Sequence, residues 1–507
     1  MIKLIKLIKL TGWTVSEFSE LTTLFNYPTN QLFNYLPMDL IAQIDDLFNS
    51  RSIAVVGVPR GLKTGSVFLT ALLEQGYSGK IYPVNPQADE IAGLKSYPSV
   101  TEIPGPVDLA IVLVPQQKAL DVVRECVAKG VKGAVLFTAG FSETGTQDGQ
   151  VLEKEMVEAA RSGSMRLIGP NGMGLYAPKT GLSFFPGVSK DPGPVGMISH
   201  SGSLTNILGT IAASKGIRFS KVISSGNECD LIAADFLAYL GNDPDTGLIG
   251  AYIEGIRNGP YFLDALRQAS LNKPVIMWKV GLTPEGARAS ASHTGALAGP
   301  RDIWQGVLKQ SGAIPVVGFE ALTDALMGFS MFPSNPGDRM AIISGPGGLA
   351  VSAAEACGRE GLQLSDFTSE TQSNLDSLIT FSGTSVFNPI DVSLTAHFDL
   401  EIFFQSTRIA AADPGVDAII VIGCGLTPET NQIYVDGMIR VQKECQKPIL
   451  AVKIPGFEAK YSQQLCLGGI PFFDSAERAV HTYALAVHYS NWLGKRFPDP
   501  GFSARHI

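Results

Sequence analysis

One histidine stands among small residues, where its ring is free of bulky neighbours. The stretch ASASHTGALAGP, residues 289–300, contains His293, and the whole chain of 507 residues has only six histidines. Neutral imidazole is a good nucleophile near pH 7. The small neighbours allow the backbone to approach a ligand or a moving partner closely. His293 is therefore a candidate functional residue, and the stretch alone leaves its role open.

Two turns rich in glycine and serine have the residue types that hold an anion. SHSGSLT (199–205) and SGPGGLA (344–350) each join the end of a predicted strand to the start of a predicted helix. A helix N-terminus offers unpaired N–H groups and about half a positive charge, which can hold a phosphate without a lysine. The candidate phosphate-binding residues are Ser201, Gly202, Ser203, Gly347 and Gly348. Ordinary helix capping is an equally good explanation of each turn and stays open.

A third turn, VVGVPRGLKTGS (55–66), also follows a predicted strand and leads into a helix. Its glycines are spaced by four residues, so it does not match GxGxxG, and the next strand ends in Asn85 rather than in an acidic residue. A nicotinamide site needs that acid for the ribose hydroxyl. The pattern argues against NAD and leaves open a phosphorylated nucleotide that lacks a free ribose diol, with a purely structural turn as the alternative. The candidate contacts are Gly57, Arg60, Lys63 and Gly65.

The elements that must position these residues repeat along the chain. Short apolar runs such as SIAVVG (52–57), DLAIVLVP (108–115) and MAIISG (340–345) alternate with segments of helical length. This alternation is typical of βαβ units and of a parallel sheet buried on both faces. The sequence therefore predicts an α/β fold.

Segments rich in proline and glycine divide the chain into blocks. FFPGVSKDPGPVG (184–196) and FPSNPGDR (332–339) predict boundaries near residues 190 and 336. The predicted segments are an N-terminal extension (1–43), three domains (44–190, 191–336 and 337–495) and a tail (496–507).

The second and third blocks read as copies of one unit. MISHSGSL (197–204) aligns with IISGPGGL (342–349), and KPVIMWK (273–279) aligns with KPILAVK (447–453). From Lys279 to GAIP at Gly312 is 33 residues, whereas from Lys453 to GGIP at Gly468 is 15, so the second block carries 18 more residues there. His293 lies within this insertion. We expect a functional loop, because loops on rigid sheets are where sites are placed.

Composition excludes several classes of function. The net charge is −8 with no large basic cluster, which argues against binding of nucleic acid or of an anionic membrane surface. The six cysteines have no metal-ligand spacing, so we predict no metal site and reduced thiols in a cytoplasmic protein. The first stretch, MIKLIKLIKL, lacks the uninterrupted apolar region of a secretory signal, and we expect a poorly ordered tail or a weakly amphipathic helix.

An ordered set of motifs resembles a known family. IDDLFNSRSIAVVGVP (44–59), GPNGMGLY (169–176), SSGNECD (224–230), YIEGI (252–256), SHTGALAG (292–299) and FNPIDV (387–392) occur in that order. This order resembles the alpha-type subunits of NDP-forming acyl-CoA synthetases, which are relatives of succinyl-CoA synthetase. The resemblance covers residues 44–490. It implies a Rossmann-like domain that binds coenzyme A, followed by two flavodoxin-like domains with parallel sheets.

The resemblance also implies roles for particular residues. His293 would be the histidine that is transiently phosphorylated, and Glu254 would orient and stabilise it. Coenzyme A would contact the turn at 57–65, together with Asn85, Pro115 and Asn171. Phosphate would be held by Gly226 and Asn227 as well as by the two glycine-rich turns.

The implied reaction interconverts acyl-CoA, ADP and phosphate with a carboxylic acid, coenzyme A and ATP, through an acyl phosphate and a phosphohistidine. The family binds ADP, ATP and magnesium on an ATP-grasp domain. We find no such domain and no Walker A motif, so we expect a separate beta-type subunit in a heterotetramer. Ser393 and Leu394 stand where the family has a Gly-bearing turn, which leaves the acyl group undefined.

Other functions were weighed against this one. No GxSxG elbow is present, which argues against a serine hydrolase. The alternative that remains is a non-catalytic coenzyme A-binding or regulatory protein that has kept the fold. We expect His200, beside one phosphate turn, to cap or pack rather than to catalyse.

Overall fold

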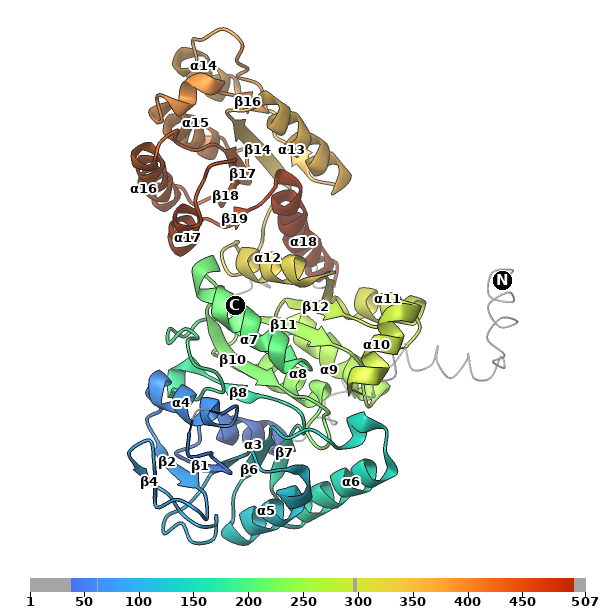
Figure 1. Ribbon diagram of the computed structural model, residues 1–507. Helices are drawn as coiled ribbons and strands as arrows, with labels where there is room; N and C mark the ends of the chain where they lie inside the picture. Colours follow the sequence, from blue (N-terminus) through green and yellow to red (C-terminus); the bar gives the residue numbers. More distant parts are fainter. Residues whose placement is uncertain (1–37, 62, 295–298, 497–507) are drawn as a thin grey trace, which may run out of the picture.

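The computed structural model describes residues 38–61, 63–294 and 299–496, and of residues 38 and 291–294 it describes the backbone alone. Three sheets lie one after another along the molecule, each covered by helices (Figure 1). We call the parts built on them the first, second and third domains. The predicted α/β fold with parallel sheets is confirmed. The expectations for residues 1–37 and 497–507 lie outside the described residues.

The first domain has a five-stranded parallel sheet in the order β2-β1-β5-β6-β7. Its strands are short and buried because helices cover both faces. A helix, α3 (Met38–Phe48), precedes the sheet and begins six residues before the predicted boundary at 44. The other elements are β1 (Ser52–Val56), α4 (Ser66–Gln75), β2 (Lys80–Val84), β3 (Glu90–Ile91), β4 (Leu94–Lys95), β5 (Leu109–Val112), α5 (Gln116–Lys129), β6 (Gly133–Leu136), η2 (Ser142–Thr144), α6 (Gln147–Ser162) and β7 (Arg166–Ile168).

The second domain has a six-stranded sheet in the order β13-β12-β11-β9-β10-β8. Its edge strand β8 (Gly174–Tyr176) pairs antiparallel with β10, although β8 precedes the predicted boundary at 190. The remaining elements are η3 (Pro178–Thr180), β9 (Val195–Ser199), α7 (Gly202–Ala212), η4 (Ala213–Lys215), β10 (Phe219–Ser224), α8 (Ala233–Asn242), β11 (Leu248–Ile253), α9 (Gly259–Asn272), β12 (Val275–Lys279), α10 (Pro284–Thr294), α11 (Arg301–Ser311), β13 (Ile314–Pro315) and α12 (Phe319–Phe329).

The third domain repeats the plan of the second. Its strands run in the order β15-β14-β17-β18-β19, with β16 also paired to β14. This order matches β10-β9-β11-β12-β13, which is the topology expected of a duplicated unit. The elements are β14 (Arg339–Ser344), α13 (Gly347–Arg359), β15 (Gln363–Leu364), α14 (Ser369–Leu378), β16 (Ile390–Asp391), η5 (Leu394–His397), α15 (Glu401–Ala412), β17 (Ala418–Ile422), α16 (Pro428–Glu444), β18 (Ile449–Val452), α17 (Ala459–Leu467), β19 (Phe472–Phe473) and α18 (Ala476–Gly494).

The described part of the insertion in the second domain is largely helical, where we expected a loop. The helices α10 and α11 stand where the third domain has the single helix α17. The backbone of His293 forms part of the last turn of α10. The sequence of α10, PEGARASASHT, begins with proline at its first helical position and contains three alanines, which favour helix. Our expectation of a loop at His293 was wrong for this local reason.

Helix packing joins the second domain to the third. α18 returns from the end of the third domain to pack against α12, as Figure 1 shows. Arg478 on α18 donates from Nε to Oδ2 of the buried Asp324 on α12 at 2.6 Å. The two domains therefore share a polar link within an apolar helix interface.

A buried carboxylate joins the first domain to the second. Asp230, whose side chain has 0% exposure, accepts from Arg161 at 3.0 Å, from Arg166 at 2.8 Å and from the Leu167 amide at 3.0 Å. Removing one member of a buried charged group leaves the others desolvated and unpaired. We expect Asp230→Ala to lower the free energy of unfolding by about 3 kcal/mol in chemical denaturation.

A matched control is Asp121→Ala, because Asp121 is 76% exposed and pairs only with Arg124 one helical turn away. We expect this exposed substitution to change the free energy of unfolding by under about 0.5 kcal/mol. Equal effects of the two substitutions would contradict a stabilising role for the Asp230 cluster.

Candidate functional site

The predicted coenzyme A contacts lie together at the carboxyl ends of strands in the first sheet. Gly57, Asn85 and Pro115 follow β1, β2 and β5, and these three strands are neighbours in the sheet. Asn85 ties two of the strand ends together, since its Nδ2 donates to the Val58 carbonyl at 2.8 Å. Ligands of open α/β sheets bind outside the carboxyl ends of the strands, where neighbouring connections diverge. The structure places these three residues at such a position, beyond the carboxyl ends of β1 and of its two neighbours β2 and β5.

The turn after β1 is compact at its first glycine and open further on. Gly57 has φ +88°, and a Cβ atom there would lie 2.9 Å from Cγ1 of Val114. Gly65 is the N-cap residue of α4 and provides no side-chain cap for the helix. The side chains of Arg60 and Lys63 are exposed, so both cations are available to a phosphorylated ligand. These features fit the binding of a nucleotide phosphate by the turn.

We expect Gly57→Ala to weaken coenzyme A binding about tenfold, because the substitution forces strain into a left-handed residue and pushes Val114 aside. Isothermal titration calorimetry of the full chain measures the dissociation constant. Gly61→Ala is the control in the same turn, since a Cβ on Gly61 meets nothing within 4 Å. If both variants bind as wild type does, the turn is not part of the coenzyme A site.

The GPNG segment connects these strand ends to the second domain. The amide of Asn171 donates to the Thr138 carbonyl at 3.0 Å, and the Thr138 hydroxyl donates to the Val114 carbonyl at 2.5 Å. On its other side, Nδ2 of Asn171 lies 3.5 Å from Oδ1 of Asn227. Asn171 therefore stands between the predicted coenzyme A contacts and the predicted phosphate contacts.

Gly226 is required by close packing. It has φ +59°, and a Cβ atom on it would lie 2.2 Å from the Pro170 carbonyl oxygen. The turn after β10 is thus pressed against GPNG. The structure brings Asn171, Gly226 and Asn227 together.

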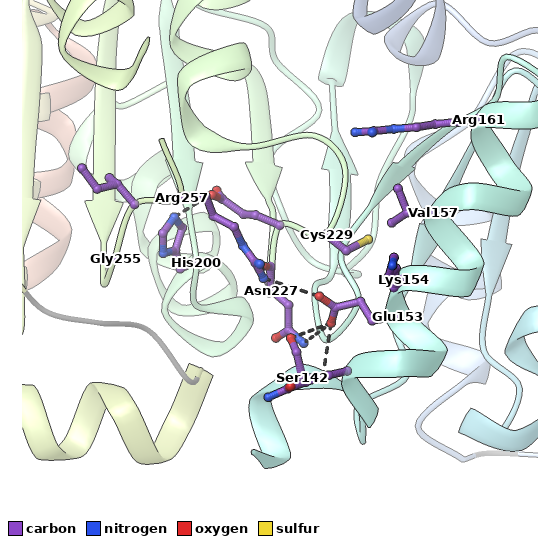
Figure 2. A pocket seen from close by; sticks show the side chains of 14 residues that line it. Ser142, Glu153, Lys154, Val157, Arg161, His200, Asn227, Cys229, Gly255 and Arg257 are labelled. Atoms are coloured by element: carbon purple, nitrogen blue, oxygen red, sulfur yellow. Dashed lines mark hydrogen bonds and ion pairs between the residues drawn. The ribbon is translucent and has the colours of Figure 1, made fainter. Parts of the chain in front are cut away.

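A cavity of about 580 Å³ opens between α6 and the carboxyl ends of the second sheet. Figure 2 shows Ser142, Glu153 and Asn227 joined by hydrogen bonds on one side, with His200 and Gly255 on the other. The lining residues are Ser142, Gln150, Glu153, Lys154, Val157, Arg161, His200, Gly226, Asn227, Glu228, Cys229, Gly255, Ile256 and Arg257. The lining combines charged side chains such as Glu153 and Arg257 with apolar ones such as Ile256.

Arg257 holds the wall of this cavity. Its guanidinium donates to the Asn227 carbonyl at 2.5 Å and lies 3.5 Å from Oε1 of Glu153. Its side chain is 47% exposed, so part of the guanidinium still faces the cavity. Cys229 lies beside it, and burial raises the pKa of that thiol well above its ordinary value. The cysteine is therefore protonated and a poor nucleophile near neutral pH.

Glu254 is buried at the carboxyl end of β11, with 3% exposure. Nζ of Lys279 donates to the backbone carbonyl of Glu254 at 2.8 Å. Burial lowers the pKa of Lys279 to about 8, although the Glu254 charge opposes this lowering. Lys279 therefore carries a positive charge at neutral pH beside Glu254.

The first phosphate turn caps α7. The Ser201 hydroxyl accepts from the Leu204 amide at 3.3 Å, as in an ordinary N-cap. Gly202 is packed so that a Cβ atom would lie 2.8 Å from Cγ of Met173. Ser203 is one residue further along the first turn, and its hydroxyl lies 3.3 Å from that of Ser201. Ser201 therefore caps α7, and phosphate binding by Ser201, Gly202 and Ser203 stays a prediction.

The second turn lies on the third domain. Gly347 and Gly348 begin α13, whose N-cap residue Pro346 provides no side-chain acceptor. A Cβ on Gly347 would lie 2.6 Å from Oδ2 of Asp391. The residues that depart from the family pattern follow, with Ser393 at φ +55° and Leu394 65% exposed. Phosphate binding by Gly347 and Gly348 also stays a prediction.

The side chain of His293 lies outside the described residues, as does the adjoining part of its motif at 295–298. The backbone of α10 lies against η2, whose Ser142 lines the cavity. The helix that carries His293 is thus adjacent to the wall that holds Asn227.

The described residues form neither a cluster of metal ligands nor a helix that could span a membrane. Among the described residues, no three His, Cys, Asp or Glu side chains converge as metal ligands would. None of the described helices is both long enough and apolar enough to cross a bilayer.

Known proteins share this architecture. Residues 51–178 match the family model for a CoA binding domain, and residues 192–329 match the succinyl-CoA ligase like flavodoxin domain. The chain is 37% identical over 458 residues to the alpha subunit of acetate–CoA ligase (ADP-forming) II from Pyrococcus furiosus, covering 88% of this chain and 98% of that one. The chain belongs to the alpha-subunit family of ADP-forming acetate–CoA ligases.

Solved structures agree with this assignment. One of them is the Candidatus Korarchaeum cryptofilum dinucleotide forming acetyl-coenzyme A synthetase 1, solved in complex with phosphate and ADP. That chain is 35% identical, covers 89% of this chain and is itself covered to 98%, with a TM-score of 0.80. PH0766 from Pyrococcus horikoshii is 31% identical over 89% of this chain and all of that one, with a TM-score of 0.77. The ligase-family fold predicted from the motifs is confirmed.

Several residues around the cavity and Glu254 of this alpha subunit are not predictable from local sequence patterns. Lys279 served only as an alignment landmark, and Arg257 and Glu153 were not singled out. Glu228 lies inside the motif SSGNECD without having been given a role, and Arg257 directly follows YIEGI. Their roles depend on contacts between separate segments, which no local spacing indicates.

Proposed function

We propose that this chain interconverts acyl-CoA, phosphate and ADP with a carboxylic acid, coenzyme A and ATP, and that its own part is acyl transfer and carriage of the phosphoryl group on His293. An oxygen of phosphate attacks the thioester carbonyl, and the C–S bond breaks to release coenzyme A. The acyl phosphate then passes its phosphoryl group to an imidazole nitrogen of His293, and the carboxylate leaves.

The observation that carries this proposal is the junction of the two predicted sites. The carboxyl end of the first sheet, with the predicted coenzyme A contacts, is linked through Asn171 to the Gly226 turn and the cavity beside it. A thioester held on the first domain would reach that cavity without leaving the protein. Holding reactants together is the larger part of what such an enzyme must supply.

Charge in the cavity fits a phosphorylated intermediate. Glu254 would support the cation that forms on a phosphorylated imidazole. Arg257 and the N-terminus of α7 would compensate the phosphate charge among the surrounding carboxylates. Phosphoryl transfer depends mainly on such positioning and electrostatic compensation.

The acceptor would be ADP with magnesium on an ATP-grasp beta-type subunit, in a heterotetramer. The name of the Pyrococcus relative, a subunit alpha, supports a partner. The chain covers 98% of that subunit but 67% of the longer acetate–CoA ligase (ADP-forming) II from Archaeoglobus fulgidus, which is 34% identical. All six cysteines are free, which fits a reducing compartment such as the cytoplasm.

The experiment is synthesis of ATP from ADP, phosphate and acetyl-CoA by this chain mixed with a beta subunit, followed by luminescence. A longer aliphatic, an aryl and a dicarboxylic acyl-CoA are tested in parallel. ATP formed with one of them supports the proposal. Tight coenzyme A binding without ATP from any acyl-CoA would favour the regulatory alternative.

A further inference from the structure

A buried histidine and glutamate form a pair that the proposed reaction does not use. His200 follows β9, is 6% exposed, and has Nε2 3.0 Å from Oε1 of Glu228, which is 3% exposed. Glu228 also accepts from the Ser225 hydroxyl at 2.9 Å and has φ +58°, a strained value for glutamate. A strained residue that orients a buried charge at the edge of a cavity is a functional candidate.

The other nitrogen of His200 touches Glu254. The Glu254 amide donates to Nδ1 of His200 at 3.2 Å. Nδ1 can accept only when it carries no proton, so the neutral ring has its proton on Nε2, which lies 3.0 Å from Oε1 of Glu228 without the alignment of a hydrogen bond. A second proton on the ring would go to Nδ1 and set it against the Glu254 amide, because both groups would then be donors.

Comparison with the duplicated third domain shows which part of this arrangement is found in the second domain but not in the third. Strand register pairs Ser199 with Tyr252 and Ser344 with Ile422, so Cys424 stands where Glu254 stands and Gly345 where His200 stands. A Cβ on Gly345 would lie 2.3 Å from Nε2 of His397, an imidazole supplied by another segment. Nδ1 of His397 lies 2.7 Å from the Cys424 carbonyl.

Both domains therefore fix the same strand end with an imidazole, but with opposite tautomers. In the third domain Nδ1 must donate to a carbonyl, whereas in the second it must accept from an amide. The two carboxylates that face the ring, Glu228 and Glu254, belong to the second domain, which also carries the insertion with His293. In the second domain, the hydrogen bond that holds the strand end at Glu254 therefore depends on the protonation state of His200.

We propose that His200 and Glu228 form a positioning pair that holds the backbone of Glu254 in place, and that protonation of His200 releases it. This inference rests on the proposed function, in which Glu254 supports the phosphorylated His293. His200 does not itself contact the reacting atoms in this account.

The surrounding charges raise the pKa at which the release occurs. Burial pulls the pKa of His200 down, but the charges of Glu228 and Glu254 outweigh it and leave the pKa raised, against a smaller opposing effect of Lys279. The hydrogen bond from Glu254 is present above this pKa and lost below it. The reaction should accordingly lose activity as pH falls through that value.

Three variants separate positioning from mere packing, with the full chain and its beta subunit assayed between pH 5 and 9. His200→Asn keeps an acceptor near Nδ1 but cannot titrate, so activity should persist and the acid limb should disappear. Glu228→Gln removes one charge, so the limb should move about one unit toward lower pH. His200→Ala should hold kcat about tenfold below the high-pH value of the wild type and show no acid limb.

A second measurement does not depend on activity. Hydrogen–deuterium exchange of the peptide that contains Glu254, in the full chain, should rise as pH falls, beyond the intrinsic change of exchange rate, and Glu228→Gln should shift this rise to lower pH. The exposed pair His481 and Glu360, with Nδ1 and Oε1 2.9 Å apart, provides the control His481→Asn, which should leave both profiles unmoved.

The inference is overturned if His200→Asn keeps the acid limb of the wild type, or if Glu228→Gln moves neither profile. Failure of the proposed function looks different. In that case the wild-type chain with its beta subunit forms no ATP at any pH, while the exchange profile still reports whether the pair holds Glu254.

Discussion

Replacing His293 by glutamine should reduce the formation of ATP from acyl-CoA, phosphate and ADP by about 10³-fold or more. Glutamine is polar and similar in size, but its amide cannot form the phosphoramidate through which the phosphoryl group would travel. Because the residue acts as the covalent carrier, no neighbouring group replaces it. The measurement is the steady-state rate with the beta subunit present.

His488→Gln is the control for this substitution, since His488 is exposed on α18 in the third domain. Its rate should equal that of the wild type. A His293→Gln enzyme that keeps a tenth or more of the wild-type rate would show that the phosphoryl group reaches ADP by another route. Coenzyme A affinity should stay unchanged, because the turn at Gly57 lies on a different domain.

Glu254→Gln should lower the same rate about 10²-fold. The substitution keeps the shape of the side chain and its backbone contacts with His200 and Lys279, but removes the charge that would support a cationic phosphohistidine. It also removes the charge that counteracts the lowering of the Lys279 pKa, so that pKa should fall below about 8.

The matched control is Glu285→Gln in the first turn of α10, where the side chain is 77% exposed. We expect less than a twofold change in its rate, because an exposed charge is well screened. Equal rates for Glu254→Gln and the wild type would remove Glu254 from the phosphoryl relay and leave its buried position without a catalytic explanation.

The sequence predicted those parts of the fold that local patterns determine. Buried runs such as SIAVVG became the central strands, and the duplication of the second and third blocks reappears as one strand order in two sheets. Residues 174–176 were less predictable. They form β8 at the edge of the second sheet, and an edge strand of three residues follows from its partner β10 rather than from its own pattern.

The candidate site was predictable where a single segment of the sequence contains the whole motif. At Gly57 and Gly226, a positive φ and close contacts require glycine. A glycine at such a position is visible in the sequence and marks its motif. The insertion was found by length alone, yet its alanine content made α10 a helix rather than a loop. The pair of His200 and Glu228 could not be foreseen, because it forms between the ends of two strands that only the sheet brings together.

The central claim is tested most directly by the chemistry of the protein-bound phosphate. The full chain is incubated with ³²P-labelled phosphate and acyl-CoA, with its beta subunit present and without ADP, and the denatured protein is analysed. The account predicts label that is lost in acid, survives in base, maps to the peptide with His293 and disappears on addition of ADP. Label that resists acid, or equal label on His293→Gln, would contradict it.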